Sequence, residues 1–152
     1  MYVKTIPDGY HSLTPYLIVK GASAAIEFYQ AAFDAEVILR LDTPDGGVAH
    51  AELKIGDSHL MMAEECADMG FLSPQTLGGS GMSLMLYLED VDSAFERAIV
   101  AGGIQLREVK DQFYGDRAGT LKDPFGHAWT LGTHKEDLTE EEIKQRMMAE
   151  FS

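Results

Sequence analysis

Two short segments in the C-terminal part of the sequence carry residue types that bind metals and small molecules. Residues 111–117 read DQFYGDR, and residues 123–129 read DPFGHAW. Carboxylates and histidine can ligate a metal or transfer protons, and aromatic rings make apolar contacts with a ligand. The first segment offers Gln112, Tyr114 and Arg117 as ligand contacts, although the same residues can serve only to hold a loop. Gly and Asp favour turns, so we expect the second segment to be a hairpin between strands.

A second group of polar residues lies earlier in the chain, in segments that alternate between polar and apolar residues. His50 and Glu52 are two positions apart in the strand-like run 48–55, so their side chains should share one face. His59 lies in the next strand-like run, 58–64. Two imidazoles and a carboxylate could bind zinc or act as acid and base. The alternative, which we favour on sequence alone, is a set of solvated or hydrogen-bonded groups on the surface of a sheet.

The composition restricts the partners and the compartment of the protein. The chain has 152 residues, of which 45% are hydrophobic, so it can bury the core of one domain. Its net charge of −13 argues against binding to nucleic acid or to an anionic membrane, and would attract a cationic ligand. The chain has one cysteine, no secretory signal at its start and no apolar stretch long enough to cross a membrane. We therefore expect a cytoplasmic protein.

The hydrophobic pattern divides the chain into two similar halves, each with a strand, a helix and three further strands. In the first half the strands are expected at 13–20, 35–41, 48–55 and 58–64, and the helix at 21–33. In the second half the strands are expected at 80–90, 104–109, 117–123 and 127–133, with a helix that begins after Asp90 or Asp92 and ends at Gly102-Gly103. A single domain of residues 1–152 would then contain a first module at 13–65, a linker at 66–80 and a second module at 81–133.

A constant shift between the two halves supports an internal repeat. It places Thr130 on Met61 (130 − 61 = 69) and Ser83 on Thr14 (83 − 14 = 69). Identities are few, but the strand–helix part aligns without a gap, as expected for two copies of one structural unit.

The tail of the chain is predicted to form a short helix at 139–151. Thr139 is followed three residues later by a glutamate, which is the pattern of a capping box. Ile143, Met147 and Phe151 then form one apolar stripe at four-residue spacing. We expect this helix to dock on the domain or on a partner chain.

Five segments of the chain resemble the vicinal oxygen chelate superfamily, which includes glyoxalase I, extradiol dioxygenases and the fosfomycin and bleomycin resistance proteins. They read TPYLIVKGASAAIEFYQAAF, GGVAHAELKIGDSHLMM, YLEDVDSAFERAIVAGG, DQFYGDRAGTLKDPFGHAWTL and THKEDLTEEE. The chain is similar to the PhnB-like, glyoxalase-like branch, many members of which have Trp at the position of Tyr114. The resemblance implies an α+β fold in which two βαβββ modules form curled mixed sheets around a cavity. It also implies a homodimer.

The resemblance further identifies four strand positions at which metalloenzymes of the superfamily hold a divalent ion. On this sequence those positions are Thr14, Met61, Ser83 and Thr130. Three hydroxyls and a thioether are poor ligands for zinc, nickel or iron. We therefore expect neither a metal nor a cofactor there, and no metal-dependent glyoxalase or dioxygenase chemistry.

Strand alternation and the resemblance together give a set of residues expected to face the cavity. They are Thr14, Tyr16, Arg40, His50, Glu52, His59, Met61, Ser83, Met85, Tyr87, Gln112, Tyr114, Arg117 and Thr130. We expect a glyoxalase-like or bleomycin-resistance-like protein that binds a small molecule in a metal-free cavity, with no catalytic residue assigned. One alternative is a glyoxalase-type lyase or isomerase with a displaced site around His50, Glu52 and His59. Another is a structural or regulatory dimer subunit whose cavity has no function.

Overall fold

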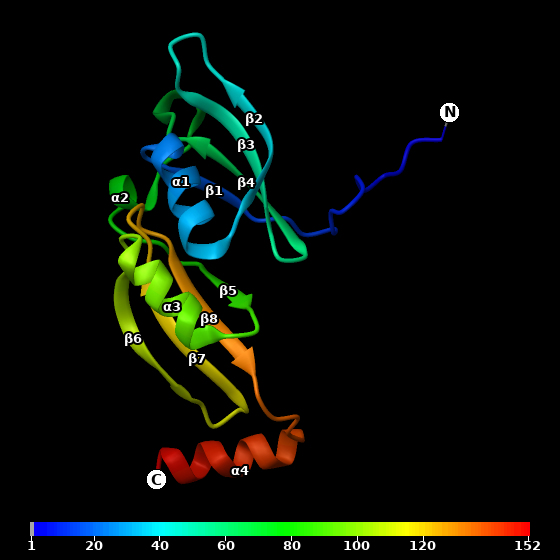
Figure 1. Cartoon of the computed structure of the whole chain (residues 1–152), viewed down its shortest axis with the longest axis vertical. Coiled ribbons are helices and arrows are strands. Elements are labelled where there is room, and N and C mark those ends of the chain that lie inside the picture. Colours follow the sequence, from blue (N-terminus) through cyan, green and yellow to red (C-terminus); the bar gives the residue numbers. More distant parts are fainter. Residues whose placement is uncertain (1) are drawn as a thin grey trace. The chain divides into compact units, whose positions relative to one another are not determined.

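The computed structural model describes residues 2–152 and divides them into two compact units (Figure 1). The first unit contains the described residues up to Ser80 together with Pro124–Gly126. The second contains Gly81–Asp123 and His127–Ser152. Each unit is built on one four-stranded sheet, so the fold is α+β, as the sequence predicts.

The first unit has the predicted order of one strand, one helix and three strands. Its elements are β1 (Tyr16–Val19), α1 (Ala22–Phe33), β2 (Glu36–Asp42), β3 (Val48–Ile55) and β4 (Ser58–Glu64). The strand order is β1-β4-β3-β2, with β1 parallel to β4 and the other neighbours antiparallel. This mixed sheet leaves one face for α1 and the other face free of helices within the unit (Figure 1).

Helix α1 covers its sheet because apolar residues recur along one side of it. Ile26, Tyr29 and Phe33 are buried, as their spacing predicts. At the start of the helix, the backbone N–H groups of Gly21 and Ala22 both donate to the Glu64 carboxylate at 2.9 Å. An anion at this position satisfies unpaired N–H groups and interacts favourably with the positive end of the helix dipole. The last residue of β4 therefore fixes where α1 begins.

The second unit repeats this arrangement and adds the tail helix. Its elements are β5 (Ser83–Tyr87), α3 (Val91–Val100), β6 (Ile104–Asp111), β7 (Asp116–Lys122), β8 (Ala128–His134) and α4 (Glu140–Glu150). The strand order is β5-β8-β7-β6, with β5 parallel to β8. Asp90 caps α3 by accepting a hydrogen bond from the Ser93 N–H at 3.2 Å, and Val91, Phe95 and Ala98 bury the helix on the sheet.

The strand register confirms the internal repeat. In the first unit Tyr16 of β1 lies opposite Met61 of β4, and in the second Met85 of β5 lies opposite Thr130 of β8. Both pairs are related by the shift of 69 residues (85 − 16 = 69 and 130 − 61 = 69). The two parallel strand pairs are therefore equivalent positions of one βαβββ unit.

The segment between the modules is more ordered than the loop expected at 66–80. It contains a 3-10 turn at Ala67–Met69 and the short helix α2 (Pro74–Leu77). Ser73 caps α2, and its N–H and hydroxyl donate to the Glu65 carboxylate at 2.8 and 3.0 Å. Ser followed by Pro is a helix-start signal as well as a loop signal, which explains the difference.

The alternation of buried and exposed side chains along β3 is interrupted at the beginning of the strand. Strict alternation with the buried Ala51 and Leu53 predicts that Ala49 packs against α1, but Ala49 is exposed and Val48 is buried instead. The pairing with β2 shifts register between Leu41 and Asp42. Such an irregularity moves the following side chains to the opposite face, which sequence alternation alone does not reveal.

The turn at 123–126 is the predicted hairpin, and Asp123 holds it together. The Asp123 carboxylate is almost fully buried and accepts hydrogen bonds from the His127 N–H and the Trp129 indole N–H, both at 3.0 Å. Gly126 has φ 93°, a value that favours glycine. The position of His127 directly after Gly126 suggests a capping role from sequence, but the capping side chain is Asp123.

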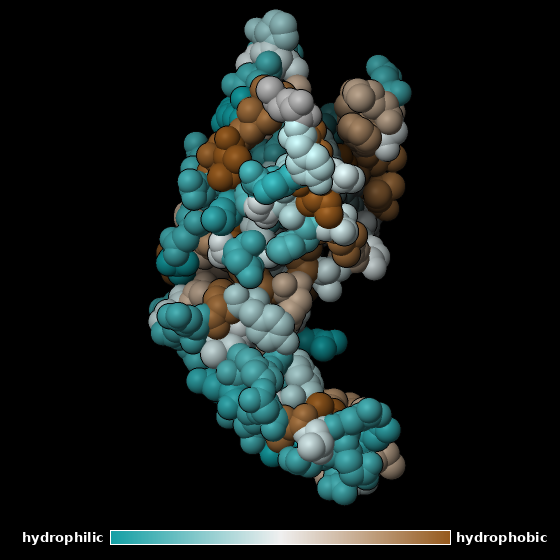
Figure 2. Space-filling view, turned by 90° about the vertical axis from the view of Figure 1, so that its right-hand side faces the viewer, coloured by the Kyte–Doolittle hydropathy of each residue, from teal (hydrophilic) through white to brown (hydrophobic). Residues whose placement is uncertain are grey.

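Helix α4 keeps most of its surface exposed within the second unit. Thr139 caps it by accepting from the Glu142 N–H at 3.2 Å, as predicted, and Arg146 forms two hydrogen bonds with Glu136. Of the predicted apolar stripe, only Ile143 is half-buried. Figure 2 shows hydrophobic side chains beside hydrophilic ones on the surface of the described chain. None of the helices within residues 2–152 combines the length and the apolar character that crossing a membrane requires.

Candidate functional site

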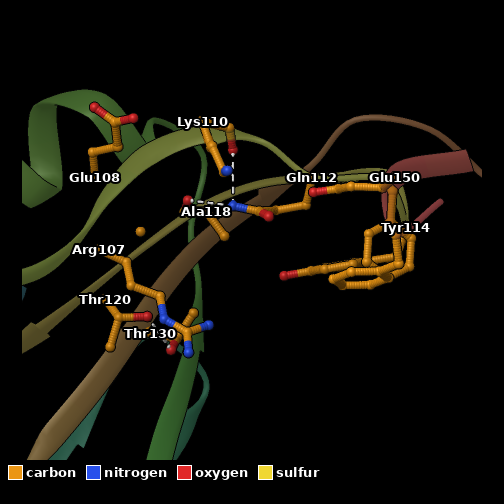
Figure 3. Close-up of a pocket in the computed structure, with 12 residues that line it drawn as sticks. Arg107, Glu108, Lys110, Gln112, Tyr114, Ala118, Thr120, Thr130 and Glu150 are labelled. Atoms are coloured by element: carbon orange, nitrogen blue, oxygen red, sulfur yellow. Dashed lines mark hydrogen bonds between the residues drawn. The ribbon is translucent and has the colours of Figure 1, made fainter. Parts of the chain in front are cut away.

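A cavity of about 510 Å³ lies in the second unit, on the face of its sheet that α3 leaves free (Figure 3). Its walls come from β6, the β6–β7 turn, β7, β8 and the end of α4. They are formed by Arg107, Glu108, Lys110, Gln112, Phe113, Tyr114, Ala118, Gly119, Thr120, Thr130, Glu150 and Phe151. Cavities of about 300–1,000 Å³ are typical for small-molecule sites in proteins.

The floor of the cavity is a row of side chains across three adjacent strands. Arg107 of β6 lies opposite Thr120 of β7, which lies opposite Thr130 of β8. The two threonine hydroxyls are hydrogen-bonded to each other at 2.9 Å. Figure 3 shows the Arg107 guanidinium beside both hydroxyls. Because the sheet sets this row, the cationic group and the hydroxyls are held in a fixed arrangement.

The β6–β7 turn supplies the aromatic wall of the cavity. The Gln112 side-chain amide donates to the Ala118 carbonyl at 3.1 Å, which anchors the turn to β7. Phe113 and Tyr114 meet edge to face with ring centroids 5.2 Å apart, and Phe151 packs against Phe113 at 6.3 Å. Figure 3 shows the Tyr114 hydroxyl directed toward the middle of the cavity. Burial, with the nearby Asp116 carboxylate, raises the pKa of the Tyr114 phenol, so this hydroxyl stays a hydrogen-bond donor at neutral pH.

The buried carboxylate of Asp116 lies on the same sheet face, at the start of β7. Asp116 accepts a hydrogen bond from the Tyr87 hydroxyl at 2.7 Å and pairs with His134 Nδ1 at 2.7 Å. His134 Nε2 also contacts Asp137 at 2.8 Å. These bonds to Asp116 and then to Asp137 raise the pKa of His134, and the bond to Asp116 raises the pKa of Tyr87. All polar atoms named here have partners, so this cluster stabilises the end of the sheet.

The first unit places the second predicted group of polar residues in a hydrogen-bonded chain. The Tyr16 hydroxyl lies 2.8 Å from His50 Nδ1, and His50 Nε2 lies 3.0 Å from a Glu52 oxygen. The other Glu52 oxygen accepts a hydrogen bond from the Tyr10 hydroxyl. The Tyr10 ring stacks on His59 with centroids 4.3 Å apart. The structure therefore brings His50, Glu52 and His59 to one surface, with Tyr10 lying against two of them.

In this hydrogen-bonded group, the pKa values of Glu52 and Tyr10 are shifted away from neutral pH, which disfavours proton transfer by either side chain. Hydrogen bonds from Tyr10 and then His50 lower the pKa of Glu52, so its carboxylate is a weak base. Burial, together with the bond to Glu52, raises the pKa of Tyr10 to about 12. His59 Nδ1 is buried and has no hydrogen-bond partner among residues 2–152. No group of three or more His, Cys, Asp and Glu side chains in that range is placed to hold a metal ion.

Most of the predicted cavity residues lie on helix-free sheet faces, in two separate groups. In the first unit, Met61 joins the cluster because it pairs with Tyr16 on one side and Glu52 on the other. In the second unit, Gln112, Tyr114 and Thr130 line the cavity. Ser83, Met85 and Tyr87 are exposed at alternate positions of β5, and Thr14 is half-buried just before β1.

Two predicted cavity residues lie on the other side of their sheets. Arg40 pairs with Asp42 at 2.8 Å and reaches Ser23 of α1 at 3.4 Å. A register shift in β2 between Val37 and Leu39 turns it toward the helix. Arg117 forms hydrogen bonds with Asp92 at the start of α3 and with Asp111. It follows Asp116 by one residue, so it must point to the opposite face.

Several residues of these sites were missed from sequence. Tyr10 precedes the first strand, where nothing in its neighbourhood indicates that it folds back on β3. Arg107 and Lys110 line the same cavity although three residues separate them, because β6 has a register shift between them. Phe113 lies within the DQFYGDR segment and Phe151 within the predicted apolar stripe, so a sequence pattern did indicate these two residues.

The four strand positions that the resemblance identifies for a divalent ion do not fit one in this chain. In the first unit Met61 lies opposite Tyr16, and its N–H donates to the carbonyl of Pro15, the residue after Thr14. Ser83 and Thr130 lie on adjacent strands of the second unit. A thioether and hydroxyls, one of which is already bonded to Thr120, offer neither the charge nor the donor strength that zinc, nickel or iron needs.

Comparisons with known proteins agree with this architecture. A protein of Mycobacterium bovis whose function is uncharacterised is 37% identical over 142 residues, which are 91% of this chain and 93% of that protein. The solved structure of an Arabidopsis thaliana gene product is 25% identical, with a TM-score of 0.64 over 80% of this chain and 98% of that one. A PhnB protein from Bacillus cereus is 21% identical, with a TM-score of 0.64 over 81% of this chain and 99% of that one.

Residues 10–131 match the family described as the Glyoxalase/Bleomycin resistance protein/Dioxygenase superfamily. This segment includes both βαβββ modules up to β8, together with Tyr10, the hydrogen-bonded chain of the first unit and most of the cavity of the second. The chain belongs to the glyoxalase/bleomycin resistance protein/dioxygenase superfamily.

Proposed function

We propose that this protein binds a small molecule in the cavity of the second unit and does so without a metal ion. The observation that carries the proposal is the cavity itself, which is about 510 Å³ in volume and combines an aromatic wall with a row of polar donors. Fixed polar groups beside aromatic side chains are typical of ligand sites. The proposed absence of a metal is supported by the donor chemistry at Thr14, Met61, Ser83 and Thr130.

Binding can be tested by thermal shift with a set of aromatic compounds that differ in charge, followed by calorimetry of those that stabilise the protein. A ligand at 100 times its Kd should add about 2.7 kcal/mol to the free energy of unfolding. Tyr114→Ala removes part of the aromatic wall and should weaken binding about tenfold, or about 1.4 kcal/mol. Tyr2→Ala, at an exposed tyrosine outside both sites, is the matched control and should bind as the wild type does. Equal binding by both variants would place the ligand elsewhere.

A glyoxalase-type lyase or isomerase acting at His50, Glu52 and His59 is the second candidate. It is supported by the meeting of these three residues on one surface. The lowered pKa of Glu52 and the raised pKa of Tyr10 weaken it, because neither group is suited to exchange protons near neutral pH. The hemithioacetal of methylglyoxal and glutathione should therefore not be turned over above background. Turnover that a chelator abolishes would contradict both this expectation and the metal-free cavity.

We also propose that the protein forms a homodimer in the cytoplasm. Support comes from the exposed apolar side chains of β2, β5 and α4, which a monomer would leave in water. Light scattering should then give a mass about twice the 16.7 kDa of one chain.

A further inference from the structure

We propose that the ligand of the second-unit cavity is an organic anion with an aromatic or apolar body, and that Arg107 binds its anionic group. The inference rests on the proposed function and specifies the class of ligand. It is opposite in sign to what the net charge of −13 suggests. The reason lies in which charges of the chain already have partners.

Arg107 and Lys110 are cations without a carboxylate partner within residues 2–152. Elsewhere in the chain, Arg40, Arg117 and Arg146 each bind a carboxylate at 2.8 Å. Lys20, Lys54, Lys122 and Lys135 also form no ion pair within residues 2–152, but none of these four lines the cavity. Two such cations line one cavity, which concentrates positive potential there.

The two carboxylates of the cavity wall do not neutralise Arg107. Figure 3 shows the Glu108 carboxylate on the opposite side of β6 from the Arg107 guanidinium, and Glu150 beside Tyr114 and Gln112, away from Arg107. Neither forms an ion pair with Arg107 or Lys110. The polar end of the cavity is therefore cationic even though the protein as a whole is acidic.

The remaining polar groups of the cavity are donors that suit an anionic oxygen. Thr120 and Thr130 share one hydrogen bond, so one of their two hydroxyl hydrogens is left to bind a ligand. The Tyr114 hydroxyl points toward the same space (Figure 3). A planar guanidinium beside a free hydroxyl matches the two oxygens of a carboxylate. A neutral ligand would leave the Arg107 charge without a counter-ion, and a cationic ligand would be repelled by it.

The apolar part of the ligand is placed by the aromatic residues. Phe113, Tyr114 and Phe151 lie around the other end of the cavity from β7 and β8 and provide ring faces and edges. An aromatic acid would thus have its ring among these side chains and its carboxylate at Arg107. The cavity volume accommodates a molecule with one or two rings.

Three matched probes test the inference on the full-length protein. They are 2-naphthoate, its neutral amide 2-naphthamide and the cation 2-naphthylmethylammonium, measured by calorimetry. We expect 2-naphthoate to bind at least tenfold more tightly than the amide, and the ammonium to bind least tightly. Arg107→Gln should remove this preference by weakening naphthoate binding about tenfold while leaving the amide unchanged. Arg40→Gln, which removes a paired arginine of the first unit, should change neither value.

The possible failures are distinguishable. If the amide or the ammonium binds as tightly as naphthoate, or if Arg107→Gln keeps the preference, the anionic class is wrong while the binding function stands. If none of the three probes binds and no aromatic compound of any charge stabilises the wild type, both the inference and the proposed function are overturned. Circular dichroism of Arg107→Gln establishes that its fold is intact, which is expected because Arg107 is exposed.

Discussion

Two of the polar residues that looked most like catalytic groups, His50 and Glu52, already have hydrogen-bond partners. Glu52 accepts hydrogen bonds from Tyr10 and His50, and His50 also contacts Tyr16. By contrast, Arg107 is unremarkable in sequence but retains its full binding capacity in the structure. At the scale of the residue, the partners of a side chain therefore indicate function better than its type does.

The Tyr10–Glu52 hydrogen bond should give the protein a pH-dependent stability that Tyr10→Phe removes. The substitution should lower the free energy of unfolding by about 1 kcal/mol at neutral pH. Glu52 has a lowered pKa, so its contribution is present above its ordinary value and is lost as the pH falls through the folded-state value. Tyr10 has a pKa raised to about 12, so its contribution is full below about 10 and is lost as the pH rises through 12.

Urea unfolding of both proteins between acid and alkaline pH measures this difference. It should be largest from about pH 5 to pH 10 and should shrink on both sides of that range. Tyr2→Phe, at an exposed position, is the control and should show no difference at any pH. A difference that stays constant from acid to alkali would mean that Tyr10 stabilises the protein by packing on His59 alone.

At the scale of the element, the sequence predicted the kind and order of the strands and helices but not every face. Period-two and helical patterns located α1, α3 and the strands because each buries one apolar side. The failures occur where a register shift breaks the alternation, as at Arg40 and Ala49, and the shift in β6 also hid the approach of Arg107 to Lys110. Long-range pairing sets these irregularities, so no local pattern contains them.

The β7–β8 hairpin should depend on Asp123 more than on any feature that a turn pattern reveals. Asp123→Ala leaves the His127 N–H and the Trp129 indole N–H without an acceptor in a buried place. We expect a loss of about 3 kcal/mol in the free energy of unfolding, measured by urea unfolding followed through Trp129 fluorescence. Asp57→Ala changes an exposed aspartate in the β3–β4 hairpin and should cost less than about 0.5 kcal/mol. Similar losses in the two variants would contradict a special role for Asp123.

At the scale of the whole molecule, the chain is a duplicated βαβββ unit in which each copy has its own buried core. The two copies keep the same register but carry different chemistry, because Glu52 opposite Met61 in β3–β4 corresponds to Thr120 opposite Thr130 in β7–β8. The duplication is visible in sequence, whereas this division of roles is not. In the first unit, Tyr10, Tyr16, His50 and Glu52 form hydrogen bonds with one another. In the second unit, the cavity contains cations that form no ion pair within residues 2–152.

The separate cores predict that the two units can lose stability independently. Phe125 belongs to the first unit, where it packs against Phe28 and Tyr29 of α1, with ring centroids 6.3 and 6.4 Å away. Phe125→Ala should therefore lower the protection of the α1 amides from hydrogen exchange by an amount equivalent to about 3 kcal/mol. The α3 amides should keep theirs. Phe95→Ala, in the buried face of α3, should give the reverse pattern. If either variant lowers the protection of α1 and α3 amides equally, the chain opens as one cooperative unit. The two sites would then lie in units that are not independently stable.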